Sequence, residues 1–310
     1  MKNKKIAVIM GGPSSEREIS LRTGQAILNS LQEKSYNVIG IDLNPQSFYN
    51  DLKENNIEVA FNAIHGKYGE DGILQGFLEL LNIPYTGSNL IASAIAMDKI
   101  ISKRLFLSAN IPTAKFKFYS LKNNNVENIH DDISTFFGQQ CVIKANSQGS
   151  SIGVSIVKNV SELKEAILDC FKYDDQILVE QFIDGREFTV SILGEEEKDV
   201  LPIVEIIPNS GCYDYRSKYT VGATNYIVPA KLNETTTKEM QINALKAYNI
   251  IGCSGAARVD IMMDKNENQY VLEVNTTPGM TATSLLPKAA LSKNISFSDL
   301  CERILLSCLK

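Results

Sequence analysis

The chain has 310 residues, 44% of them hydrophobic and 22% charged, which is ordinary for a globular protein with a substantial core. With 36 acidic and 31 basic side chains the net charge is -5, and no basic cluster beyond the first five residues indicates a nucleic-acid surface. The longest apolar runs are too short to cross a bilayer or to form a secretory signal, so we expect a cytoplasmic protein of two or three domains.

Cysteine spacing excludes two further classes. The six cysteines stand at positions 141, 170, 212, 253, 301 and 308, and no two of them form a C-x-x-C pair. This pattern argues against a zinc knuckle and against a disulfide framework, and it agrees with reduced thiols in the cytosol.

The first hundred residues alternate strands and helices. We expect strands at 6–10, 38–41 and 59–63 and a helix at 16–34, where apolar residues recur at helical spacing. The run 6–10 is continuously apolar and stops at Gly11-Gly12, as in a buried parallel strand. This order predicts a doubly wound parallel sheet with ligands at the carboxyl ends of its strands, where the segments 11–18, 42–45 and 65–72 lie.

Two further units follow in chain order. Between residues 98 and 182 we expect helices at 98–109 and 161–171 and strands at 116–119, 142–145, 154–157 and 177–180. After Gly185 the chain becomes rich in strands, at 187–193, 201–207, 225–228, 255–263 and 270–274, with helices at 237–250 and 296–309.

The segment 258–275 predicts a metal-binding hairpin. Because side chains alternate between the faces of a strand, Arg258 and Asp260 share one face, and so do Glu273 and Asn275. Two carboxylates and an amide oxygen suit a hard cation such as Mg²⁺, and Arg258 beside them can neutralise a phosphoryl group. An EF-hand beginning at Asp264 fails, because its sixth position lacks glycine. A solvated edge hairpin is the plainer alternative.

The glycine loop, residues 148–153, lies between two predicted strands and can fold over a phosphate, with Lys144 at the end of the preceding strand. A simple glycine hairpin is the alternative. Neither a P-loop nor a dinucleotide fingerprint occurs in the chain, so a bound nucleotide requires another architecture. His65 opens a loop at a strand end, where a ligand contact and a local turn role are both open.

Together these segments resemble the D-alanine–D-alanine ligase family of the ATP-grasp superfamily. They run in family order along nearly the whole chain: GGPSSEREISLRTG (11–24), HGKYGEDG (65–72), MDK (97–99), KANSQGSSIGV (144–154), VEQFIDGREFTV (179–190), YDYRSKY (213–219), ARVDIM (257–262) and EVNTTPGMTATSLLP (273–287). The chain departs from the family pattern at Ala145, at Gln181 and in the loop after Tyr219.

The resemblance implies an α/β fold of three domains with ATP held between the second and the third. The implied domains are a substrate-binding α/β domain at 1–97, a central ATP-grasp domain at 98–183 and a C-terminal catalytic domain at 184–310. It also implies ATP as a substrate, two Mg²⁺ or Mn²⁺ ions as cofactors, D-alanine as the partner small molecule, and a homodimer.

The resemblance further assigns roles to residues. For ATP they are Lys99, Lys144, Gly149, Ser150, Ser151, Glu180, Gln181, Ile183 and Glu187, with Glu180 at the base and Glu187 at the ribose. For the metal they are Asp260, Glu273 and Asn275. For the amino acids they are Glu16, His65, Arg258 and Ser284. For catalysis they are Glu16, Ser151, Tyr219, Lys218, Arg258 and Gly279, with Ser151 and Tyr219 as hydrogen-bonded partners of Glu16 that hold a loop over the site.

The implied reaction has two steps, in which one D-alanine forms an acyl phosphate and a second D-alanine then displaces phosphate, for peptidoglycan precursor synthesis. A ligase that takes D-lactate second is an alternative, disfavoured by Lys218-Tyr219. Another ATP-grasp carboxylate–amine ligase is disfavoured by the segment around Glu16. A non-catalytic nucleotide-binding regulator would be expected to lack Asp260 or Glu273.

Overall fold

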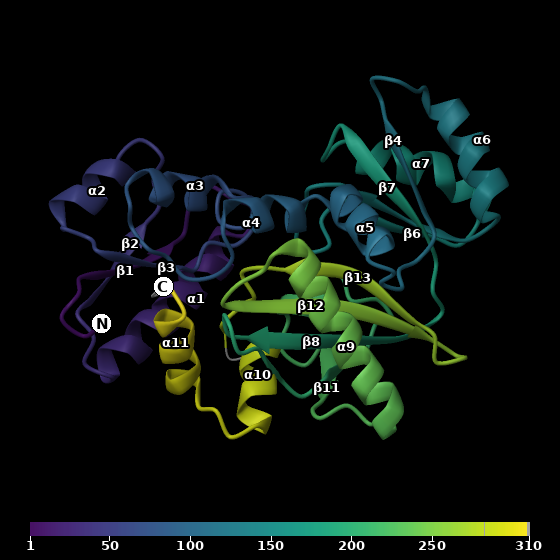
Figure 1. Cartoon of the computed structure of the whole chain (residues 1–310). Coiled ribbons are helices and arrows are strands. Elements are labelled where there is room, and N and C mark those ends of the chain that lie inside the picture. Colours follow the sequence, from purple (N-terminus) through teal and green to yellow (C-terminus); the bar gives the residue numbers. More distant parts are fainter. Residues whose placement is uncertain (282, 309–310) are drawn as a thin grey trace.

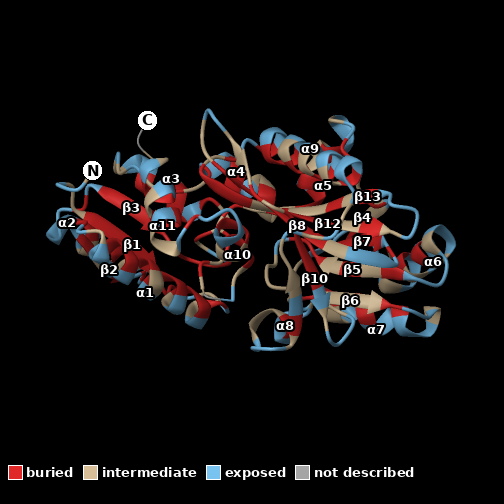
Figure 2. Cartoon of the chain, turned by 90° about the horizontal axis from the view of Figure 1, so that it is seen from below, coloured by how far each residue is buried: buried red, intermediate tan, exposed pale blue. Residues whose placement is uncertain are grey.

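The computed structural model describes residues 1–281 and 283–308, and it contains three sheets with helices packed on them (Figure 1). Within these residues, no helix combines the length and the apolar character needed to cross a membrane. Figure 2 shows that buried residues concentrate along the strands, while the outer faces of the helices are exposed. The α/β fold expected from the sequence is confirmed.

The N-terminal sheet has the parallel topology that the sequence predicts. Its order is β2-β1-β3, with β1 (Ile6–Met10) buried along its whole length between the other two strands. The remaining elements of this unit are α1 (Arg17–Glu33), β2 (Val38–Asp42), α2 (Phe48–Glu54), β3 (Val59–Asn62) and α3 (Ile73–Leu80). The loops after β1 and β3 lead to Glu16 and His65, so both side chains lie at the carboxyl edge of the sheet.

The last helix of the chain packs on this N-terminal unit, and the helix before it lies against the third sheet. They are α10 (Leu285–Ser292) and α11 (Phe297–Leu306), and α11 packs against α1 (Figure 1). The Lys34 ammonium lies 2.7 Å from carboxylate oxygens of both Asp299 and Glu302 on α11. Position 309 of the predicted terminal helix lies outside the described residues.

The central sheet is antiparallel, with the order β4-β7-β5-β6. Its apolar core joins the strands to α6 and α7 through residues such as Ile133, Ile143 and Ile167. The elements are β4 (Phe116–Ser120), α6 (Val126–Phe137), β5 (Cys141–Ala145), β6 (Val154–Val157), α7 (Val160–Cys170) and β7 (Gln176–Gln181).

The third sheet has the order β11-β10-β8-β12-β13, and β9 pairs with β8. Its elements are β8 (Gly185–Leu193), β9 (Asp199–Val200), β10 (Val204–Pro208), α8 (Tyr215–Tyr219), β11 (Thr224–Ile227), α9 (Glu234–Ile251), β12 (Ala256–Asp264) and β13 (Gln269–Asn275). The strand predicted at 201–207 begins at Val204, because Pro202 has no N–H to donate to a ladder.

Two helices from earlier in the chain pack on this third sheet. They are α4 (Leu90–Met97) and α5 (Lys99–Ser108), whose buried Ala92, Ala96 and Phe106 belong to one apolar cluster with Val190 and Ile261. The boundary proposed between residues 97 and 98 therefore falls between two helices that share the core of the C-terminal sheet.

Candidate active site

A cavity of about 640 Å³ lies between the central and C-terminal sheets. The central sheet contributes Lys144 from β5 and Glu180 from β7 to its wall. The other wall carries three carboxylates, Glu187 from β8, Asp260 from β12 and Glu273 from β13. Gln181, Ile183 and the glycine-loop residues Gly149, Ser150 and Ser151 also line this cavity. Every residue assigned to ATP by the resemblance is thus on one surface.

Lys99 binds the backbone of the glycine loop. The Lys99 ammonium donates to the carbonyl oxygen of Gln148 at 2.6 Å. Ser150 and Ser151 both adopt left-handed backbone angles, with φ values of 50° and 59°. Such angles are uncommon for residues with side chains, and here they turn two consecutive hydroxyls in different directions.

Glu180 lies between two lysines at the central-sheet end of the cavity. Its carboxylate is 2.5 Å from the ammonium of Lys144 and also forms an ion pair with Lys103. Burial alone would raise the pKa of Glu180, but the two ammonium groups lower it to about 2. The sequence analysis did not assign a role to Lys103, which is fully buried.

The hairpin of β12 and β13 brings together the residues predicted from strand parity. Asp260 pairs with Glu273 across the ladder and Arg258 pairs with Asn275, and the register shifts between Asp260 and Ile261. The Arg258 guanidinium binds both carboxylate oxygens of Asp260 at 3.0 Å. Burial would raise the pKa of Asp260, but Arg258 keeps it below its ordinary value.

These side chains fit the donor set of a hard divalent cation. Asp260 and Glu273 offer carboxylate oxygens, and Asn275 offers an amide oxygen while its nitrogen donates to Asp260 at 3.0 Å. Glu187 lies on the neighbouring strand, and burial, with the nearby Asp260, raises its pKa to about 7. Among the described residues there is no cluster of three or more His, Cys, Asp or Glu side chains that could hold a metal, and the set here combines two carboxylates with the amide of Asn275.

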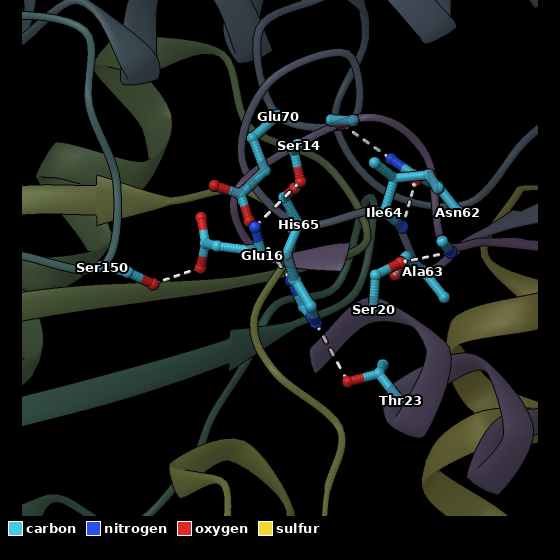
Figure 3. A network of polar contacts seen from close by, with 12 residues as sticks. Ser14, Glu16, Ser20, Thr23, Asn62, Ala63, Ile64, His65, Glu70 and Ser150 are labelled. Carbon is cyan, nitrogen blue, oxygen red and sulfur yellow. Dashed lines mark hydrogen bonds and ion pairs between the residues drawn. The ribbon is translucent and has the colours of Figure 1, made fainter. Parts of the chain in front are cut away.

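A second, smaller cavity of about 90 Å³ adjoins the first on the side of the N-terminal sheet. Glu16 reaches it from the loop before α1, and Figure 3 shows the Glu16 carboxylate directed at Ser150 of the glycine loop. Burial, and the charge of Glu70, raise the pKa of Glu16. The remaining predicted residues on this cavity are His65, Lys218, Tyr219, Arg258, Gly279 and Ser284.

The partner of Glu16 in the glycine loop is Ser150, which corrects the assignment of Ser151. The Ser150 hydroxyl donates to Glu16 and lies 2.7 Å from the Tyr219 hydroxyl, which itself lies 3.2 Å from Glu16. Ser151 instead donates to the carbonyl oxygen of Tyr213 at 3.1 Å. The left-handed turn at both serines directs the first hydroxyl to Glu16 and the second away from it.

Lys218 and Tyr219 lie on α8, a short helix whose first turn is capped by the Asp214 carboxylate. The Lys218 ammonium lies 5.2 Å from the centre of the Tyr213 ring. Lys218 and Tyr213 each line both cavities. The α8 segment therefore covers the place where the two cavities meet.

His65 is held at both ring nitrogens. Its Nε2 lies 3.0 Å from the Thr23 hydroxyl and its Nδ1 lies 3.3 Å from the Glu70 carboxylate, as Figure 3 shows. The His65 ring is thus a fixed part of the wall of the small cavity. Ser284, which lines the same cavity, is the N-cap residue of α10. Its hydroxyl accepts a hydrogen bond from the backbone N–H of Thr281 at 3.0 Å.

Two antiparallel sheets that enclose a nucleotide-sized cavity, with the Lys144–Glu180 ion pair on one wall and a hairpin carrying carboxylates on the other, define an ATP-grasp ligase. Family models described as "D-ala D-ala ligase C-terminus" and "D-ala D-ala ligase N-terminus" match residues 105–306 and residues 5–55 and 44–88. The chain belongs to the D-alanine–D-alanine ligase family.

Individual relatives agree with this membership. The chain is 48% identical to a D-alanine–D-alanine ligase of Carboxydothermus hydrogenoformans and 45% identical to one of Pelotomaculum thermopropionicum, covering 97% of itself in each case and 97% and 95% of those proteins. A crystal structure of the D-alanine–D-alanine ligase from Bacillus anthracis complexed with ATP superposes with a TM-score of 0.85 at 35% identity, over 99% of this chain and 97% of that one. The VanG D-Ala:D-Ser ligase from Enterococcus faecalis gives the same TM-score at 29% identity, over 99% of this chain and all of that one.

Proposed function

We propose that this enzyme joins two D-alanine molecules into D-alanyl-D-alanine, converting ATP to ADP and phosphate, for peptidoglycan precursor synthesis. The observation that carries this proposal is the meeting of the two cavities. The large one and the small one share Gly149, Ser150, Tyr213 and Lys218 on their walls. The γ-phosphate of ATP at the end of the large cavity would thus lie next to the carboxylate of a D-alanine bound in the small cavity.

Glu16 binds the ammonium group of the first D-alanine in this proposal. The Glu16 residue is 5% exposed, and its carboxylate already accepts hydrogen bonds from Ser150 and Tyr219, so its position is fixed before substrate arrives. Arg258 lies across the small cavity, where its guanidinium can orient the substrate carboxylate. Holding the carboxylate in line with the γ-phosphate supplies much of the rate enhancement.

Charge on the transferred phosphoryl group is neutralised by cations of this chain. Lys99, Lys144 and Lys218 line the large cavity, and backbone N–H groups of the glycine loop lie beside them. Asp260, Glu273 and Asn275 would hold Mg²⁺ or Mn²⁺, two ions in the arrangement we propose. The metal, when bound, supplies further positive charge to the phosphate oxygens.

The second step takes place at the carboxyl carbon of the first D-alanine. The resulting acyl phosphate is attacked by the amine of the second D-alanine, and phosphate leaves through a tetrahedral intermediate. Arg258, Gly279 and Ser284 line the small cavity. In this proposal Arg258 and the backbone N–H of Gly279 stabilise the oxyanion, and Ser284 binds the second carboxylate. Ser150 and Tyr219 hold α8 over the cavities and keep water from the acyl phosphate.

Product analysis tests this function. The purified protein is incubated with Mg²⁺ and ATP and with D-alanine, L-alanine, D-lactate or D-alanine plus D-serine, and ADP and ligated products are identified by mass. ADP release that requires D-alanine and yields D-alanyl-D-alanine supports the proposal. ADP release coupled to a depsipeptide or to a D-serine product in preference would contradict it.

We also propose a cytoplasmic homodimer that uses the N-terminal unit. ATP supply favours the cytoplasm. Along α3 and α4, Ile73, Leu80 and Ile91 expose 52%, 82% and 64% of their surfaces, which suits a contact with a second copy. A sedimentation mass near that of one chain would contradict the dimer.

A further inference from the structure

Helix α5 carries two buried lysines, of which one lines the nucleotide cavity and the other lies behind its wall. Lys99 and Lys103 are four residues apart and therefore lie on one face of the helix. Both side chains are buried, and Lys99 reaches the glycine loop at Gln148. Lys103 reaches Glu180, and nothing in the reaction described above uses it.

The Lys103 ammonium has three partners. It donates to the Thr113 hydroxyl at 2.6 Å and lies 3.3 Å from the carbonyl oxygen of Val271, and it forms an ion pair with Glu180. Lys103 is 0% exposed and Glu180 is 2% exposed. Apart from this ion pair, the Oε1 atom of Glu180 has no hydrogen-bond partner in the described part of the chain.

The two lysines that bind Glu180 differ in their access to the cavity. Lys144 and Glu180 line the cavity wall, whereas Lys103 lies behind Glu180 and is absent from that wall. Lys144 can therefore turn towards a phosphate that enters the cavity. Lys103 is fixed by Thr113 and Val271 and remains with Glu180.

We propose that Lys103 is a positioning residue for the nucleotide, holding the Glu180 carboxylate in place at the base end of the cavity while Lys144 serves the phosphates. This inference rests on the proposed use of ATP. A buried carboxylate that loses its counterion is strongly destabilised, so Glu180 needs one cation that does not move with the substrate. Through Val271, the same cation also anchors β7 to β13, the strand that carries Glu273 and Asn275.

A double-mutant cycle tests the proposal. The four proteins are wild type, Lys103→Met, Glu180→Gln and the double variant, and the readouts are the ATP dissociation constant by calorimetry, with KM and kcat from ADP release. Lys103→Met is expected to weaken ATP binding about tenfold or more while kcat changes less than about threefold. In the Glu180→Gln background the same substitution is expected to change ATP binding less than about threefold. Lys103→Arg, which keeps the charge, is expected to restore most of the affinity.

Lys117→Met is the matched control. Lys117 pairs with Asp132 at 2.7 Å in the same sheet unit as Glu180, but both side chains are partly exposed and neither lines the cavity wall. Its substitution is expected to leave ATP binding unchanged. If Lys103→Met does not fold, Lys103→Gln replaces it in the cycle, because the amide keeps a donor for Thr113 without the charge.

Two results would overturn the inference. One is an unchanged ATP affinity in the Lys103 variant, and the other is an equal loss in both Glu180 backgrounds, which would indicate a purely structural role. A wild-type protein that fails to bind ATP would instead contradict the proposed function.

Discussion

The hydroxyl oxygen of Tyr219 lies 2.7 Å from that of Ser150, although Ser150 lies in a loop of the central sheet and Tyr219 in a connection of the third sheet. Both hydroxyls reach the same carboxylate oxygen of Glu16, from a third part of the chain. One carboxylate thus joins the N-terminal loop, the glycine loop and α8. In the proposed function, substrate binding and closure over the site would depend on the same three side chains.

Removal of the Tyr219 hydroxyl is expected to uncouple ATP consumption from ligation. In Tyr219→Phe, α8 loses its hydrogen bonds to Ser150 and Glu16, so kcat for dipeptide formation falls about tenfold or more. Water reaches the acyl phosphate, and more than one ADP is released per dipeptide. The measurement is ADP and dipeptide in the same reaction. Tyr215→Phe, on the exposed side of the same helix, serves as the control, and an equal effect there would contradict this role for Tyr219.

The two adjacent serines are expected to differ. Ser150→Ala removes a hydrogen bond to a buried carboxylate and raises KM for the first D-alanine about tenfold. Ser151→Ala removes a bond to the Tyr213 carbonyl oxygen and changes that KM less than about threefold. Steady-state kinetics with varied D-alanine measures both. The reverse order of effects would restore Ser151 as the partner of Glu16.

Loss of a metal-binding carboxylate is expected to impair phosphoryl transfer more than nucleotide binding. Glu273→Gln lowers kcat at moderate Mg²⁺ about a hundredfold, because the amide is a weaker ligand for a hard cation. ADP binding in chelator stays within about threefold of the wild type. Glu267→Gln, in the turn of the same hairpin, is the control. Full turnover by Glu273→Gln at low Mg²⁺ would disprove the metal assignment.

Glu187 is expected to make the unliganded protein less stable as the pH rises. Its pKa is raised from 4.5 to about 7, so between these values the folded protein binds a proton that the unfolded chain has lost. Its contribution to the free energy of unfolding is therefore complete below about pH 4.5 and is lost as the pH rises through 7. Glu187→Gln removes this dependence, so the variant loses roughly 2 kcal/mol less than the wild type between pH 5 and 8. Urea unfolding in chelator at both pH values measures the difference, and parallel losses would contradict the shift.

The sequence was sufficient to predict the hairpin and the side chains that share one of its faces, because alternation along two strands depends only on local spacing. It placed Arg258, Asp260, Glu273 and Asn275 on one face, and the ladder confirms that placement. The shift in register beside Asp260 depends on the packing of the whole sheet and was not predictable. The parallel N-terminal strands were likewise predicted from their apolar runs.

Non-local contacts account for what the sequence did not reveal. Two consecutive serines offer the same hydroxyl, and only the left-handed backbone at both decides that Ser150 faces Glu16. Lys103 was given no role from the sequence, although its position one turn after Lys99 and on the side of Phe106 was a usable signal. The packing of α4 and α5 on the third sheet joins residues far apart in the chain, which local patterns do not encode.

The most direct test of the proposed acyl phosphate follows one oxygen atom of the substrate carboxylate. D-Alanine labelled with ¹⁸O in both carboxylate oxygens is incubated with enzyme, Mg²⁺ and ATP, and the released phosphate is analysed by mass. Attack of the first carboxylate on the γ-phosphate transfers one labelled oxygen to each phosphate, because the carboxylate oxygen that attacks phosphorus leaves with it. Unlabelled phosphate accompanied by D-alanyl-D-alanine would contradict the acyl phosphate and with it the proposed meeting of the two cavities at the reacting groups.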